Sequence, residues 1–390
     1  MIDQPVQDAK EAAARVVEQH LDDLVALSHS VHATPELCFD ETRSARTVVD
    51  ALRAGGLEVT EGVYDLPTAF ESRSGHGDLV VAVCAEYDAL PGVGHACGHN
   101  IIAASAVGAG LALAAVADQI GLEVRVLGTP AEEGGGGKVF MLERGAFDQV
   151  HAAMMIHPWP TERLTGACLA VSHFDVHFTG KEAHASAAPW EGINALDAMT
   201  ISQVALGLLR QQLPPGDQVH GVITQGGGAA NVIPASVTGR FMVRSRTIEA
   251  LRSAEARVRA CFEAGAVATG CTVEYEELSP VYSHMEADVD LLAAYRLNAE
   301  ALGRTFDADD SGGPLPTFST DMANVSLAVP TIHPLVGIET HGAVNHQHEF
   351  AAACITPSAD SAVRDGAIAL AWTAIDAATN PDLRERLLSA

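Results

Sequence analysis

Three short, mostly apolar runs place the strongest constraint on the fold of this chain of 390 residues. They span residues 79–85, 122–128 and 152–156. Runs of this length without regular alternation are typical of strands that are buried on both faces of a sheet. Residues 9–29 and 41–54 carry helical patterns. The sequence therefore predicts an α/β domain whose mixed, largely parallel sheet is flanked by helices.

Each apolar run is followed by residues that can bind a metal. Cys97 and His99 come after the first run, Glu132 and Glu133 follow the second in a glycine-rich loop, and His157 follows the third. Because ligands bind beyond the carboxyl ends of parallel strands, we expect these side chains to meet at one edge of the sheet. Thiolate and imidazole bind transition metals, and two adjacent carboxylates let one hold a metal while the other moves protons.

Each of these features has a simpler explanation when it is taken alone. Most cysteines are core residues, paired glutamates usually lie in solvated loops, and a histidine at a strand end is often a hydrogen-bonded loop residue. A fourth group, in a late loop, contains His341, His346 and His348. The convergence of all four groups on one sheet edge favours a metal site. Five ligands exceed the four of a closed tetrahedral site, which suits two metal ions.

The composition argues against several classes of partner. The chain has 23 Lys and Arg against 50 Asp and Glu, and this net charge of −27 disfavours nucleic acid or an anionic membrane. The sequence has no apolar span of about 18 residues and no secretory pattern at its N-terminus. Its seven cysteines have no paired spacing. We therefore expect a cytoplasmic protein with reduced thiols.

The pattern changes after about residue 172, where polar and apolar residues begin to alternate. Strands and helices are expected in the order β-α-β-β-α, at 174–178, 191–213, 219–224, 237–244 and 248–264. This order favours an inserted α+β domain, at 174–286, with an antiparallel sheet. The flanking parts, 1–173 and 287–390, are expected to form one discontinuous, metal-binding catalytic domain.

Motifs along nearly the whole chain resemble those of the aminoacylase/carboxypeptidase-type dimetal metallopeptidase family. The resemblance is closest to its amidohydrolase branch, which includes aminobenzoyl-glutamate hydrolases, auxin-conjugate hydrolases and β-alanyl-lysine dipeptidases. The motifs are HATPE at 32–36, EYDALP through GHN at 86–100, PAEEGGGG at 130–137, GKEAHA at 180–185, STDMANVS at 319–326, and the spacing of His346 and Phe350. The resemblance implies that the inserted domain is a lid that also forms a homodimer.

The resemblance implies a set of metal ligands, namely Cys97, His99, Glu133, His157 and His346. These residues are expected to hold two divalent ions. Thiolate and imidazole favour Zn²⁺, while the carboxylates leave Mn²⁺ or Co²⁺ open. Many relatives have a metal-binding histidine where this chain has Glu86, and Cys97 is expected to supply that ligand instead.

The resemblance also implies catalytic roles. Glu132 is expected to be the general base that activates the water and later protonates the leaving amine, and Asp88 to orient a metal ligand. His184 is expected to stabilise the oxyanion in a neighbouring subunit, although it could be a simple exposed histidine at a strand end. Asn231 and Arg244 are expected to contact substrate. A turn residue and an ion pair within the lid are equally consistent with these two positions.

The expected reaction is hydrolysis of the amide bond of a small N-acyl or N-aroyl amino acid, or of a dipeptide, by metal-activated water. The alternative is a catalytically silent metal-binding or regulatory protein on the same scaffold. The presence of Glu132 beside a full set of ligands argues against this alternative.

Overall fold

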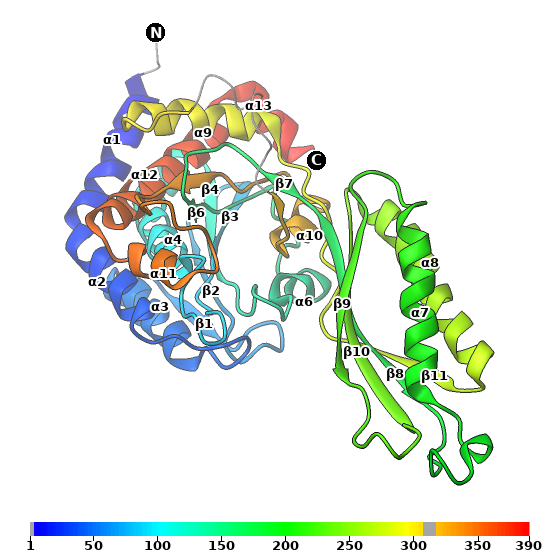
Figure 1. Cartoon of the computed structure of the whole chain (residues 1–390). Helices are drawn as coiled ribbons and strands as arrows, with labels where there is room; N and C mark the ends of the chain where they lie inside the picture. Colours follow the sequence, from blue (N-terminus) through cyan, green and yellow to red (C-terminus); the bar gives the residue numbers. More distant parts are fainter. Residues whose placement is uncertain (1–3, 307–316, 390) are drawn as a thin grey trace. The chain divides into compact units, whose positions relative to one another are not determined.

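The computed structural model describes residues 4–306 and 317–389. It divides into two compact units, formed by residues 1–167 with 285–390 and by residues 168–284 (Figure 1). We call them the main unit and the inserted unit. Within the described ranges, no helix combines the length and the apolar character that crossing a bilayer requires.

The main unit is built on a six-stranded sheet with the order β1-β2-β4-β3-β5-β13. Its strands are β1 (Val59–Glu61), β2 (Phe70–Ser74), β3 (Leu79–Ala85), β4 (Leu122–Gly128), β5 (Ala152–Met154) and β13 (Thr331–Ile332). The β4, β3, β5 and β13 pairs are parallel, whereas the β1–β2 and β2–β4 pairs are antiparallel. The predicted mixed, largely parallel sheet is confirmed.

Helices flank this sheet, and short strands lie beside it. The helices are α1 (Gln4–Gln19), α2 (Leu21–His32), α3 (Thr42–Ala54), α4 (His99–Ala114), α5 (Ala117–Ile120), α6 (Gly137–Glu143), α9 (Val289–Ala301), α10 (Met322–Ser326), α11 (His348–Ala353), α12 (Pro357–Thr379) and α13 (Pro381–Leu388). The short strands are β6 (His157–Trp159), β7 (Ala167–Cys168), β12 (Thr317–Phe318) and β14 (Leu335–Gly337).

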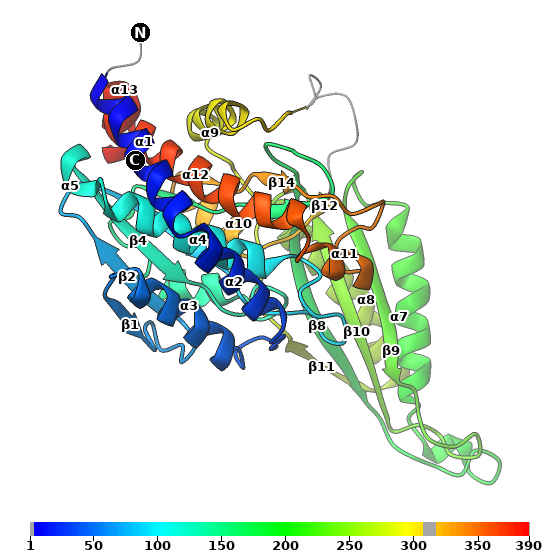
Figure 2. The same ribbon diagram turned by 90° about the vertical axis from the view of Figure 1, so that its left-hand side faces the viewer.

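Helix α4 lies between the sheet and α12, and it is buried along almost its whole length (Figure 2). Its sequence is rich in alanine and glycine, so the neighbouring helices can approach closely. A Cβ at Gly108 would lie 2.8 Å from the Cβ of Ala367 on α12. Because His99 is the first residue of this helix, tight packing of α4 holds a predicted ligand in place.

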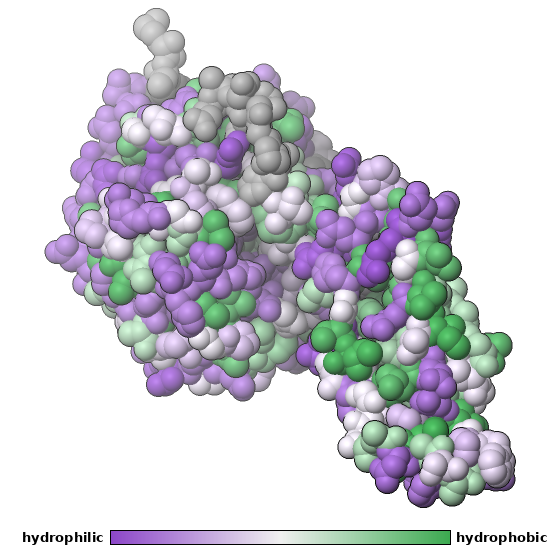
Figure 3. Space-filling model, in the orientation of Figure 1, coloured by the Kyte–Doolittle hydropathy of each residue, from purple (hydrophilic) through white to green (hydrophobic). Residues whose placement is uncertain are grey.

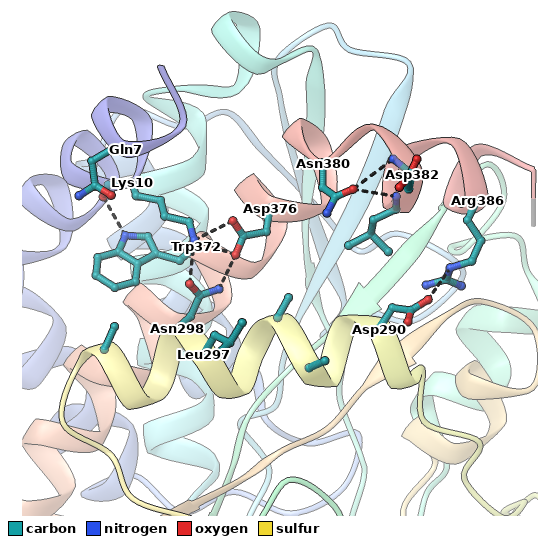
Figure 4. Close-up of a pocket in the computed structure, with 14 residues that line it drawn as sticks. Gln7, Lys10, Asp290, Leu297, Asn298, Trp372, Asp376, Asn380, Asp382 and Arg386 are labelled. Atoms are coloured by element: carbon teal, nitrogen blue, oxygen red, sulfur yellow. Dashed lines mark hydrogen bonds and ion pairs between the residues drawn. The ribbon is translucent and has the colours of Figure 1, made fainter. Parts of the chain in front are cut away.

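Polar contacts join α1 to the C-terminal helices (Figure 4). The Lys10 ammonium lies 2.7 Å from Asp376 and donates to the side-chain oxygen of Asn298, while the Trp372 indole N–H donates to the Lys10 carbonyl. These residues line a groove of about 890 Å³ between α1, α9, α12 and α13. The contacts connect both ends of the chain within the main unit.

The register of the parallel strands brings their carboxyl ends together. Ala85, the last residue of β3, pairs with Gly128, the last residue of β4. Val83 pairs with Met154 at the end of β5. The three loops that follow these strands therefore leave the sheet from the same edge, as the sequence predicts.

The inserted unit has a four-stranded antiparallel sheet with the order β11-β8-β10-β9, packed against two helices. Its elements are β8 (Ala170–Thr179), α7 (Ala195–Arg210), β9 (Gln218–Gln225), β10 (Ser236–Ser245), α8 (Ile248–Thr269), β11 (Thr272–Glu277) and a short 3₁₀ helix (Pro189–Glu191). The aromatic ring of Phe262 on α8 packs on Phe174, Phe178 and Phe241 of the sheet. The predicted α+β insert with an antiparallel sheet is confirmed.

Some details differ from the expectations. Strand β8 is continuous from Ala170, so residues 170–173 belong to the inserted unit rather than to the catalytic domain. Strand β11 was not expected, because its alternating residues are mostly exposed and polar. The prediction of a single helix at 9–29 is wrong, because two helices meet there at His20.

Glu41 links two parts of the main unit. One carboxylate oxygen accepts the backbone N–H of Ala131 at 2.8 Å and the other accepts the Thr68 hydroxyl at 3.2 Å. Ala131 has a φ of 61°, a left-handed conformation that is unfavourable for alanine, so the bond from its N–H supports the loop that carries Glu132. Burial and the nearby Asp88 raise the pKa of Glu41 to about 7.

We predict that Glu41→Gln changes how stability depends on pH. The folded state holds the Glu41 proton more tightly than the unfolded state, whose pKa is near 4.5. Relative to the glutamine variant, the wild type should therefore lose up to about 3 kcal/mol of unfolding free energy as the pH rises through 4.5–7. Urea unfolding of both proteins across this range measures the difference.

Glu36 provides the control, because burial opposes but does not outweigh its bonds to the Ser44 N–H and Arg43, which hold its pKa below the ordinary value. Relative to Glu36→Gln, the wild type should lose stability as the pH falls. An unfolding free energy that follows the same pH dependence in wild type and Glu41→Gln would contradict the assignment.

Candidate metal centre

A sharp turn at the start of α4 places two predicted ligands side by side. Gly98, between Cys97 and His99, has a φ of 76°, and a Cβ there would lie 2.7 Å from the Cγ of Pro158. Only glycine adopts this conformation at low cost and allows so close an approach. Because Pro158 follows His157 in β6, the same contact brings β6 and the start of α4 together.

Four groups of side chains in the described residues can hold a metal ion, and within each group the ligand atoms lie within 4.8 Å of one another. The groups are Cys97 with His99 and His157, Cys97 with Glu133 and His346, His99 with Glu132 and Glu133, and Glu86 with Glu132 and Asp321. The first two groups share Cys97 and together contain all five predicted ligands. A shared thiolate between two sets of ligands suits two neighbouring cations.

Of the three late histidines, His346 is the one that the structure brings to this cluster. Its Nε2 lies 3.9 Å from a carboxylate oxygen of Glu133, and its backbone N–H donates to the carbonyl of Ala96. His346 has a φ of 71°, so the loop is bent at this residue. All three histidines are exposed, but among the described residues only His346 belongs to a group of possible metal ligands.

Asp88 orients two of the predicted ligands. Its carboxylate accepts the Nδ1–H of His99 at 2.9 Å and the backbone N–H of Glu133, also at 2.9 Å. The proton of His99 is therefore on Nδ1, and Nε2 faces the cluster. The Nδ1 of His157 donates to the Pro158 carbonyl at 2.9 Å, which leaves Nε2 of His157 free to bind a metal.

Burial and neighbouring charges shift the pKa values of the cluster. Burial lowers the pKa of His157 well below its ordinary value, so this ring stays neutral. Burial would also lower the pKa of His99, but the carboxylates of Asp88 and Glu86 raise it. Burial, together with Glu86 and Glu133, raises the pKa of Glu132. Burial thus favours the neutral form of Glu132, whereas the neighbouring carboxylates favour the charged form of His99.

The donor set fits two divalent cations. Thiolate, imidazole and carboxylate together suit Zn²⁺ or a similar metal. Within the described part of the chain, the buried Nε2 of His99 has no hydrogen-bond partner. Metal coordination satisfies such an atom without a hydrogen bond. The predicted ligands therefore have the composition that a metal centre needs, and all of them except the exposed His346 are buried or half-buried.

Sequence reasoning missed a buried ion cluster behind these ligands. The ammonium of Lys138, at the start of α6, lies 2.5 Å from Glu86 and 2.7 Å from Asp321, and none of the three side chains is exposed to solvent. His333 was also missed, and its ring centroid lies 5.3 Å from that of His157. A lysine directly after four glycines gave the only hint of the cluster, because lysine is almost always exposed.

Three predicted site residues lie in the inserted unit. His184 follows β8 and pairs with Val232, and the N–H of Ala185 donates to the carbonyl of Asn231, so His184 and Asn231 are neighbours. Both side chains are exposed. Arg244 is half-buried on β10, where its guanidinium contacts the sulfur of Met242. The roles of these three residues toward substrate stay predictions.

The fold and the cluster together define a metal-dependent hydrolase of the two-domain type. Residues 74–364 match the model of the peptidase family M20/M25/M40, and the chain belongs to this family. It is 38% identical over 390 residues to the Xaa-Arg dipeptidase of Mus musculus, covering 96% of this chain and 90% of that protein. It is 34% identical over 264 residues to one subunit of the p-aminobenzoyl-glutamate hydrolase of Escherichia coli, covering 62% of this chain and 54% of that protein.

Solved structures share the fold. The aminobenzoyl-glutamate utilization protein of Klebsiella pneumoniae superposes with a TM-score of 0.73 at 19% identity, covering 92% of this chain and 97% of that one. A dinuclear metal-binding M20 peptidase of Bacillus subtilis superposes with a TM-score of 0.66 at 22% identity, covering 92% and 99%. The predicted family is confirmed, and the chain is an enzyme that hydrolyses amide bonds of small acyl amino acids or dipeptides.

We predict that Asp88→Asn weakens metal binding. The amide cannot accept both N–H groups as a carboxylate does, so His99 and the Glu133 loop lose their alignment. Metal affinity should fall by about 10- to 100-fold, as measured by titration with a competing chelator. Asp175→Asn, which removes a buried carboxylate from the Arg240 pair in the inserted unit, is the control and should retain wild-type affinity. Unchanged affinity in Asp88→Asn would contradict the assignment.

Proposed function

We propose that this enzyme is a dipeptidase whose substrates carry a basic residue at the C-terminus, that it uses two Zn²⁺ or Mn²⁺ ions, and that it acts as a homodimer in the cytoplasm. The observation that carries the catalytic part is the position of Glu132. One of its carboxylate oxygens lies 3.8 Å from Nε2 of His99, yet Glu132 is in neither of the groups that share Cys97. It is thus beside the metal ligands and available for proton transfer.

Two observations support a basic substrate. The relative that matches over 96% of this chain is named an Xaa-Arg dipeptidase, whereas the aminobenzoyl-glutamate hydrolase of Escherichia coli matches over 62%. The net charge of −27 also favours the approach of cationic rather than anionic molecules. Hydrolysis of an acidic substrate such as p-aminobenzoyl-glutamate is the second candidate. A panel of Xaa-Arg, Xaa-Lys, N-acetyl and aminobenzoyl substrates distinguishes the two.

When bound, two divalent ions polarise the scissile carbonyl and make a water molecule nucleophilic near neutral pH. Glu132 accepts the proton of that water and passes it to the leaving nitrogen.

In the inserted unit, the N–H groups of Ser186 and Ala187 both donate to Nδ1 of His184, at 3.3 and 3.2 Å. The ring proton of neutral His184 is therefore on Nε2, which can donate to the oxyanion that develops during attack. Arg244 and Asn231 are proposed to bind the substrate carboxylate and amide.

The choice of metal follows from the ligand types. A thiolate and three imidazoles are soft to intermediate donors and favour Zn²⁺, whereas the carboxylate of Glu133 is compatible with Mn²⁺ or Co²⁺. All seven cysteines are reduced thiols, and a reducing compartment such as the cytoplasm keeps them in that state.

The inserted unit has a surface suited to self-association. Ile201, Val204 and Leu208 form an exposed apolar face of α7, and Val222 is exposed on the edge strand β9 (Figure 3). An edge strand has unpaired N–H and C=O groups that can pair with the same strand of a second copy. We propose that this face of α7 and the edge of β9 form the dimer interface.

We predict that Glu132→Gln lowers turnover on the order of 10²- to 10⁴-fold while both metal ions stay bound, because it removes the proton acceptor but no ligand. Turnover of a hydrolysed dipeptide and metal content are measured on the same preparation. Glu349→Gln, at an exposed glutamate on α11, should retain full activity. Wild-type turnover in Glu132→Gln would contradict the role of the base. Bound metal without turnover of any substrate by the wild type would favour the catalytically silent alternative.

We predict that the double variant Val204→Glu, Leu208→Glu is monomeric. Burying two like charges in an interface is strongly unfavourable. Light scattering measures the mass of the variant, of the wild type and of Val289→Glu, a control at an exposed valine of the main unit. An active monomer of the wild type would contradict both the dimer and the proposed action of His184 across subunits.

A further inference from the structure

Glu86 is the one member of the buried ion cluster whose second oxygen points away from Lys138. Its Oε1 lies 2.5 Å from the Lys138 ammonium. Its Oε2 is buried and, among the described residues, has no hydrogen-bond partner. This oxygen lies 3.4 Å from Nε2 of His99, which is also without one. Two unsatisfied polar atoms therefore face each other in the interior.

When His99 binds a metal through Nε2, no hydrogen lies between these two atoms. In that state the ring is neutral, and its one proton is on Nδ1, where Asp88 accepts it. The Oε2 of Glu86 also presents a lone pair, and two facing lone pairs repel unless a cation lies between them. Two ligand atoms at about 2.1 Å from a shared tetrahedral zinc ion are about 3.4 Å apart. The observed separation of 3.4 Å fits joint coordination.

The charge of the cluster leads to the same conclusion. Lys138 contributes one positive charge, whereas Glu86 and Asp321 contribute two negative charges, and all three side chains are buried. An uncompensated buried carboxylate is costly, and a cation at Oε2 compensates it. Both oxygens of Asp321 already accept from Lys138, one from the ammonium and one from the backbone N–H. The negative charge that Lys138 does not balance is therefore on Glu86, whose Oε2 faces His99.

Lys138 also excludes a separate third metal site. The carboxylates of Glu86, Glu132 and Asp321 lie close enough to hold an ion of their own. However, the ammonium of Lys138 contacts both Glu86 and Asp321 and takes the place that such an ion would need.

We propose that Glu86 is a further ligand of the metal centre, binding through Oε2 the ion held by His99, and that Lys138 is the positioning residue that directs this oxygen. The proposal rests on the metal centre proposed above. It assigns to Glu86 a role that the five predicted ligands leave out. Because a carboxylate oxygen is a harder donor than thiolate or imidazole, it increases the preference of this position for Mn²⁺ relative to Zn²⁺.

The test compares metal binding in Glu86→Gln and Asp321→Asn. Both variants remove one carboxylate from Lys138, but only the first removes the oxygen that faces His99. Each full-length protein is titrated with Co²⁺, Mn²⁺ and Zn²⁺ against a competing chelator, and the visible absorption of the Co²⁺ form is recorded. Glu86→Gln should weaken one of two metal equivalents by about 10- to 100-fold, more for Mn²⁺ than for Zn²⁺, and change the Co²⁺ absorption. Asp321→Asn should retain the wild-type absorption and bind both equivalents more tightly than Glu86→Gln does.

Three results would overturn the proposal. Wild-type affinities and absorption in Glu86→Gln would show that the oxygen binds no ion. Equal losses in Glu86→Gln and Asp321→Asn would show that Glu86 serves only to balance Lys138. A wild type that binds no metal at Cys97 and His99 would overturn the metal centre as well, which distinguishes the two failures. If Glu86→Gln does not fold, Glu86→Asp keeps a negative charge beside Lys138 and withdraws the oxygen by one methylene, so the same loss of one metal equivalent is expected.

Discussion

The concentration of buried negative charge at one edge of the sheet is the constraint on which the rest of this structure depends. Five acidic side chains meet there, and a single lysine is buried with them; the acids are Glu86, Asp88, Glu132, Glu133 and Asp321. Carboxylates are rarely stable in the interior without positive charge. Two divalent ions and Lys138 would supply five positive charges, one fewer than the six negative charges of five carboxylates and one thiolate. Binding of two ions would therefore offset most of this charge as well as supply the chemistry.

Strand register, a glycine turn and a few hydrogen bonds position the residues of this centre. Parallel register delivers three loops to one edge, glycine at 98 allows a turn close to β6, and Glu41 supports the left-handed residue Ala131. Asp88 and the Pro158 carbonyl then select the tautomers of two histidines. Each of these contacts positions at least one residue of the site, so a change in any one of them alters the geometry there.

Much of the fold could be predicted from the sequence because burial leaves clear patterns. The strands at 79–85 and 122–128 were predicted with their observed ends, since both faces are covered and turn residues follow them. Residues of the predicted centre were found because several groups of possible ligands converge on one sheet edge and because their motifs resemble those of the family. Lys138 was missed because the sequence does not reveal that a lysine is buried. The role of Glu86 was missed because it depends on which of its two carboxylate oxygens accepts a hydrogen bond from Lys138. The proposed action of His184 depends on a second subunit, which local patterns do not encode.

Anomalous diffraction from crystals grown with Zn²⁺ tests the central claim most directly. The account predicts two peaks within bonding distance of Cys97, one also bound by His99 and His157 and the other by Glu133 and His346. Peaks that leave Cys97 and His157 in separate sites, or no peak at the carboxyl edge of the sheet, would contradict it.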